Sequence, residues 1–118
     1  MKNEINLSVY DFQQQFTAFL DDLKNRVVTK SAEYSRNNDA FSNFNTAAVL
    51  KRKDARLILD DYDTKHLVSY MDMISDIENG INPTDKYSAE KLGDIIVYMG
   101  ILHIMNVTEN NKDQTLPF

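Results

Sequence analysis

The chain has 118 residues, 42% of them hydrophobic and 26% charged, with a formal net charge of −5. A domain of this length buries enough surface to fold without stabilising disulfides or metal ions. The lack of cysteine excludes thiolate zinc sites and cysteine nucleophiles. The acidic balance argues against non-specific binding to nucleic acid. No secretory leader or membrane-spanning stretch is visible, so we expect a cytoplasmic protein that does not enter a membrane. We predict a single helical domain over residues 1–109 and a flexible polar tail over residues 110–118.

The first amphipathic segment covers residues 8–34. Ser8 is a candidate N-cap, with Asp11 three residues later as in a capping box. Apolar side chains then recur at three- and four-residue steps, which predicts a helix with one buried face: Val9, Phe12, Phe16, Leu20, Leu23 and Val27. The following residues, 35–45, are rich in Asn, Asp and Ser and predict a polar loop. We expect Phe41 and Phe44 to hold that loop to the core.

The rest of the chain predicts three more helices. A short one is expected over residues 46–53 with Leu50 facing inward, and a longer one over 54–79 with Gly80 at its C-terminal cap. A turn at 82–85 leads to a last helix over 88–107. No stretch alternates long enough to be a strand. The predicted fold is therefore all-α, a compact antiparallel bundle of three long helices and one short helix.

Two pairs of carboxylates lie four residues apart, Asp72 with Asp76 and Glu90 with Asp94. At that spacing each pair shares one face of its helix. On adjacent antiparallel helices the two pairs could face each other and hold Mg²⁺, which prefers oxygen ligands and bridges to substrate phosphates. The alternative is that these acids are solvated, with Asp94 paired to Lys91.

Four further residues are candidates for nucleotide binding. His66 falls near the apolar stripe of its helix, either as a hydrogen-bonded core residue or in contact with a phosphate or base, with Lys65 beside it. Lys30 and Tyr34 lead into the Asn-rich loop and could form one wall of a ligand cleft, or belong to an ordinary surface loop. The basic run over residues 51–56 is either a phosphate-binding edge or the cationic end of a short helix.

Several catalytic motifs are missing from the sequence. There is no glycine-rich phosphate loop, no GxSxG elbow and no HExxH helix. Their absence argues against common nucleotide kinases, hydrolases with a serine triad, and zinc enzymes. No catalytic residue is assigned.

Four short segments stand out in the sequence: KSAEY (30–34), DAFSNF (39–44), KHLVS (65–69) and EKLGDIIVY (90–98). Their order resembles that in small nucleotide-modification-associated proteins of phages and prophages, and the likeness covers roughly residues 10–105. The last helix is also similar to the MazG-like all-α nucleoside triphosphate pyrophosphohydrolases, which bind Mg²⁺ through an ExxE and a later ExxD motif. Glu90 and Asp94 fall at the second motif, with four-residue instead of three-residue spacing, and Asp72 and Asp76 are the nearest stand-ins for the first.

Two functions follow as hypotheses. The resemblance and the paired carboxylates imply a phage-type protein of nucleotide metabolism that binds a nucleotide with Mg²⁺, and the likeness to MazG-like proteins implies a homodimer. The alternative is a non-enzymatic acidic protein that binds and inhibits a host protein, such as a nucleic-acid-binding defence enzyme. Its binding surface would be an exposed stripe of acids: Asp60, Asp61, Asp63, Asp72, Asp76 and Glu78. Converging, partly buried acids would favour the metal site instead.

Overall fold

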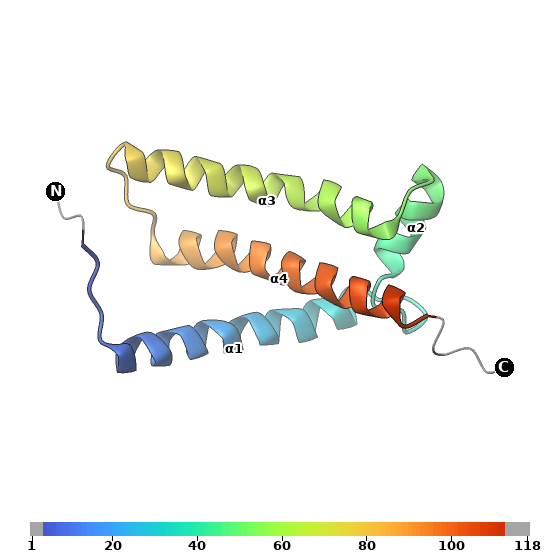
Figure 1. Ribbon diagram of the computed structural model, residues 1–118, viewed down its shortest axis with the longest axis horizontal. Helices are drawn as coiled ribbons and strands as arrows, with labels where there is room; N and C mark the ends of the chain where they lie inside the picture. Colours follow the sequence, from blue (N-terminus) through green and yellow to red (C-terminus); the bar gives the residue numbers. More distant parts are fainter. Residues whose placement is uncertain (1–3, 113–118) are drawn as a thin grey trace. The chain divides into compact units, whose positions relative to one another are not determined.

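The computed structural model describes residues 4–112, apart from the side chains of residues 33 and 34. Over that range the chain forms four helices and no strand (Figure 1): α1 (Val9–Tyr34), α2 (Ser42–Lys51), α3 (Ala55–Glu78) and α4 (Asp85–Asn110). The prediction of an all-α chain with three long helices and one short helix is confirmed. None of the helices in the described range is long and apolar enough to cross a membrane.

The backbone divides into two compact units, one ending at Glu33 and the other beginning at Tyr34. The first unit contains α1, and the second contains α2, α3 and α4. The single domain expected over residues 1–109 stays a prediction. Of the expected tail, residue 110 still belongs to α4, and residues 113–118 lie outside the described part of the chain.

Helix α1 begins as the sequence predicts. The Ser8 Oγ accepts a hydrogen bond from the backbone N–H of Asp11 at 3.1 Å, which satisfies one of the donors left free in a first helical turn. Of the predicted apolar face, Leu23 is buried, whereas Phe12 and Phe16 remain about half exposed and pack their rings on each other at 5.6 Å.

Helix α2 starts four residues earlier than predicted, because the polar loop closes more tightly. Asn37 and Asn38 both adopt the left-handed conformation (φ 56° and 57°), which asparagine tolerates better than most residues. The turn that they form is closed by a 2.9 Å hydrogen bond from the backbone N–H of Asp39 to the carbonyl of Arg36. Leu50, predicted to face inward, is 79% exposed, so that prediction was wrong.

Helices α3 and α4 form an antiparallel hairpin, visible in Figure 1. Gly80 ends the first helix with φ 80°, and its N–H bonds to the carbonyl of Ile77 while the N–H of Ile81 bonds to that of Asp76. This is a Schellman motif, and it reverses the chain within a few residues. Thr84 then caps α4, its Oγ1 accepting from the N–H of Tyr87, so the helix begins three residues before the predicted start.

The core of the second unit lies along the seam between α3 and α4. Its buried residues come from both helices: Ile58, Leu59 and Met73 from α3, and Gly93, Ile95 and Met105 from α4. At one end of the seam the Arg56 guanidinium donates to the Asn106 side-chain oxygen at 3.1 Å. At the same end α2 packs on α3, where the rings of Phe44 and Tyr62 lie 5.7 Å apart. Phe44, expected in a loop, thus lies within α2 and contacts α3 through its ring.

Candidate functional site

His66 of α3 and Asp94 of α4 meet across the seam. The imidazole Nδ1 lies 3.6 Å from a carboxylate oxygen of Asp94, which is too long for a hydrogen bond and close enough for an ion pair when the imidazole is protonated. The His66 side chain is 13% exposed and that of Asp94 is 33% exposed. A predicted nucleotide-binding residue and a predicted metal ligand are thus brought together in the tertiary structure.

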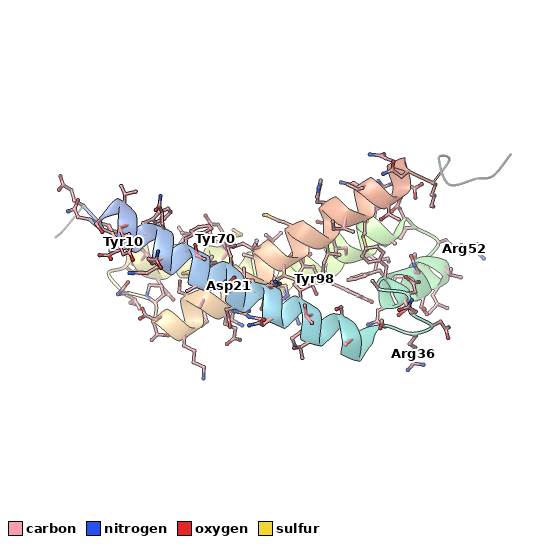
Figure 2. The ribbon with its side chains drawn as sticks, turned by 90° about the horizontal axis from the view of Figure 1, so that it is seen from below. Tyr10, Asp21, Arg36, Arg52, Tyr70 and Tyr98 are labelled. Atoms are coloured by element: carbon pink, nitrogen blue, oxygen red, sulfur yellow. The ribbon has the colours of Figure 1, made fainter. Side chains whose placement is uncertain are left out.

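Tyr98 extends this contact along α4. Its ring centroid lies 5.0 Å from that of His66, with the two planes tilted by 45°. Burial raises the pKa of the Tyr98 phenol, and the nearby carboxylates of Asp63 and Asp94 raise it further. Figure 2 labels Tyr98 on its helix. Because the negative charges of Asp63 and Asp94 both act on this phenol, the electrostatic potential around Tyr98 is negative.

Asp63, which the sequence analysis placed in the exposed acidic stripe, was not named there as a candidate ligand-binding residue, and neither was Tyr98. The Asp63 Oδ1 oxygen is buried and has no hydrogen-bond partner in the described part of the chain. Burial raises the pKa of the Asp63 carboxyl, with a smaller opposing effect from His66. Its spacing in the sequence could have indicated this position, because Asp63 lies three residues before His66 and therefore on the same face of α3. Asp63, His66, Asp94 and Tyr98 are called the α3/α4 cluster below.

Three residues of α4 follow one line along the helix: Glu90, Asp94 and Tyr98 are spaced by four residues. Glu90 is exposed and contacts Lys91 at 3.8 Å. From Glu90 to Tyr98 the helix rises by about 12 Å. The cluster therefore continues as a strip with an exposed carboxylate at one end and an aromatic ring at the other.

The other predicted metal ligands and Lys65 lie on a different flank of α3. At 3.6 residues per turn, Asp63 lies about 60° around the helix axis from His66, in one rotational sense. Asp72, Asp76 and Lys65 are displaced by roughly 80–120° in the opposite sense, and all three are exposed. Among the described residues, no three His, Asp or Glu side chains are gathered so that they could hold a metal ion. The four-carboxylate set stays a prediction, and only its α4 half adjoins the cluster.

The remaining candidates are Lys30, Tyr34 and the basic run over residues 51–56. Lys30 is exposed on α1, in the first of the two units, and the Tyr34 side chain lies outside the described residues. In the basic run, Arg56 is held by the Asp54 carboxylate, with contacts of 3.0 and 2.7 Å, and Lys53 is bound to Asp61 at 2.6 Å. Hydrogen bonds from Arg56 lower the pKa of Asp54 to about 2. Two of its four cations are thus neutralised locally, which favours the structural interpretation of the run.

The acids of α3 do not form one broad stripe. Asp60 and Glu78 share one line along the helix, while Asp61 and Asp72 share another, roughly 100–120° around the axis. Asp61 is already paired with Lys53, and Asp63 turns inward to the cluster. Asp72, Asp76 and Glu78 are exposed, so the metal site and the acidic docking surface of the sequence analysis both stay predictions.

Comparison with known proteins adds no assignment: no protein-family model, curated protein or solved structure matches this chain.

Proposed function

We propose that the chain binds a nucleotide along the face of the α3–α4 hairpin that carries the α3/α4 cluster. The observation that supports this most directly is the contact between His66 and Asp94. It joins a residue of the KHLVS segment to one of the EKLGDIIVY segment, two of the four segments on which the resemblance to nucleotide-associated proteins rests. Aromatic rings beside half-buried acids are suited to a ligand with a flat base and a metal-bound phosphate.

Mg²⁺ fits this proposal through two carboxylates on α4. Mg²⁺ keeps several waters and is commonly bound by one or two carboxylates together with substrate phosphates, so it does not require a complete cage of side chains. Glu90 and Asp94, one turn apart on one face, would hold it. When bound, the ion would neutralise the phosphates of a ligand that the acidic cluster would otherwise repel. Asp72 and Asp76 are not part of this proposal, because they lie on the other flank of α3.

A second copy of the chain is the protein partner that we expect. Leu67, Tyr70, Met71 and Ile74 of α3 are between 39% and 67% exposed, and Met99 of α4 is 61% exposed. Large apolar side chains gathered on neighbouring turns are typical of a protein–protein interface. Analytical ultracentrifugation of the wild type and of Met71→Asp tests this expectation. A wild type that sediments as a monomer at micromolar concentration would contradict it.

The proposed function is tested by a thermal-shift panel of nucleoside mono-, di- and triphosphates, each with and without Mg²⁺. A ligand that binds only the folded chain at a hundred times its Kd stabilises it by about 2.7 kcal/mol, which raises the melting temperature by several degrees. We expect a Mg²⁺-dependent shift with at least one nucleotide class. The shift should disappear in Asp94→Asn and persist in Asp72→Asn, an exposed acid on the opposite flank.

Two results would contradict the proposal. One is the absence of any shift across the panel, and the other is an equal shift in the wild type and in Asp94→Asn. The matched variant Asp72→Asn separates a local role of Asp94 from a general effect of removing one negative charge from an acidic protein.

A further inference from the structure

The inference concerns how the nucleotide is oriented in the proposed site and which base is preferred there, and it rests on the proposed function. We propose that the nucleotide lies along the hairpin with its base at Asp63 and Tyr98 and its phosphates at Glu90. Asp63 then selects a base that presents two adjacent N–H donors on one edge, as guanine does.

The first observation is the unmatched acceptor of Asp63. Its buried Oδ1 has no hydrogen-bond partner among the described residues. Buried polar atoms are seldom without a hydrogen bond, because an unsatisfied one destabilises the folded state. The terminal torsion of a carboxylate is soft, so the half-buried side chain can turn to present its oxygens to a ligand. A ligand with N–H donors would supply the missing hydrogen bonds.

The second observation is the pair of rings beside this carboxylate. His66 and Tyr98 have their ring centroids 5.0 Å apart, His66 lowers the pKa of Asp63, and the charge of Asp63 raises the pKa of Tyr98. Flat rings next to an acceptor form the usual surroundings of a nucleobase, which stacks on one group and hydrogen-bonds through its edge to another. Lys65 is not part of these surroundings, since it lies about 100° around the helix from His66.

Charge sets the direction of the ligand along the strip. Asp63 and Tyr98 at one end of the strip are partly buried, and the Asp63 carboxylate there would repel a phosphate. Glu90, about 12 Å away along α4, is exposed and can share a hydrated Mg²⁺ with phosphates. The base is therefore placed at the partly buried end and the phosphates at the solvated end.

The hydrogen-bond donors and acceptors along the edge of each base then predict which base is preferred. A carboxylate accepts two parallel hydrogen bonds from adjacent donors, and guanine presents such a pair on its N1 and its exocyclic amino group. Uracil presents one N–H between two carbonyl oxygens, which repel a carboxylate. Hypoxanthine differs from guanine by the single missing amino group, so inosine nucleotides are the matched comparison.

The experiment is isothermal titration calorimetry with guanosine, inosine and uridine triphosphates in the presence of Mg²⁺. For the wild type we expect guanosine triphosphate to bind about 10-fold or more tightly than inosine triphosphate, since a good bidentate pair discriminates by roughly 5- to 150-fold. In Asp63→Asn, which keeps the side-chain shape, this ratio should fall to about 1. The control is Asp60→Asn, one turn away and exposed, which should retain the ratio of the wild type.

The outcomes separate this inference from the proposed function. Mg²⁺-dependent binding that Asp94→Asn abolishes, without a guanine preference in the wild type or with the same preference in Asp63→Asn, overturns the role of Asp63 and leaves the nucleotide site standing. Absence of binding by all three nucleotides overturns both. A melting curve of Asp63→Asn at the same pH shows that any loss is not a failure to fold.

Discussion

The imidazole of His66 lies 3.6 Å from the Asp94 carboxylate, and the two side chains come from opposite helices of a hairpin. The contact places one turn of α3 against one turn of α4 and so defines their register at the candidate site. Tyr98, one turn beyond Asp94, packs on the same imidazole, which leaves His66 between an acid and an aromatic ring. A histidine in this position is held in place while remaining partly open to a ligand.

Asp63→Asn is expected to raise the stability of the free protein at neutral pH. Burial raises the pKa of Asp63 above its value of 3.8 in the unfolded chain, so its contribution to stability is complete below pH 3.8 and is lost as pH rises through the folded pKa. At neutral pH the buried, ionised carboxylate therefore destabilises the folded state, and the neutral amide of asparagine removes this penalty. We expect a gain of a few degrees in melting temperature near neutral pH, shrinking at acidic pH. Asp60→Asn should show a smaller change, and a lower melting temperature for Asp63→Asn at pH 7 would contradict the argument.

Ile58→Ala should destabilise the chain far more than Leu57→Ala. Ile58 is 1% exposed at the seam between α3 and α4, whereas its neighbour Leu57 is 53% exposed. Truncating a buried isoleucine removes transfer free energy and leaves a cavity, for a loss of about 2–5 kcal/mol. Truncating the exposed leucine should change the unfolding free energy by about 0.5 kcal/mol or less. Urea titrations of the two variants measure both values, and equal losses would show that the seam is not where the structure places it.

Asp54→Ala should remove the N-cap of α3 and lower the unfolding free energy by about 1 kcal/mol. The Asp54 side chain accepts from the N–H of Arg56 at 2.9 Å and also binds its guanidinium. Since these bonds lower the pKa of Asp54 from 3.8 to about 2, the stability that they provide is present above about pH 4 and lost as pH falls to about 2.

Asp54→Asn separates the two parts of that contribution. It retains a cap acceptor but loses the charge, so it should fall between the wild type and Asp54→Ala at neutral pH. Denaturation curves at about pH 5 and about pH 2 should show the wild type and Asp54→Asn converging in acid. A difference between them that does not change with pH would be the opposing result.

Substituting the two exposed glycines with alanine should have effects of opposite sign. Gly80 has φ 80° after α3, and a Cβ there meets no atom within 4 Å, so the only penalty is backbone strain of roughly 1–2 kcal/mol. Gly100 lies inside α4 and is equally open, so alanine there should stabilise the helix by about 0.5–1 kcal/mol. Thermal unfolding of Gly80→Ala and Gly100→Ala checks the signs, and a stabilising Gly80→Ala would argue against the left-handed cap.

Local chemistry made the helix ends of this chain predictable in part. Ser8 and Gly80 act at the positions expected of them, because a hydroxyl acceptor before a first turn and a glycine after a last turn satisfy or relax neighbouring backbone groups. The start of α2 was missed because two successive asparagines, Asn37 and Asn38, both take the left-handed conformation and shorten the loop. The start of α4 was missed because Thr84, placed in the turn, serves as its cap.

The sequence by itself determined the helical class of the chain and the residue types available to a site: paired acids, one histidine near an apolar stripe, and no cysteine. Only the tertiary structure decided which acids converge. Helical spacing relates residues within one helix, but it does not say which flank faces the neighbouring helix. That choice depends on how Ile58, Leu59 and Met73 pack against Ile95 and Met105, because burying these side chains sets the rotation of each helix. In the packed structure the Asp63 Oδ1 is buried and Asp72 is left in solvent.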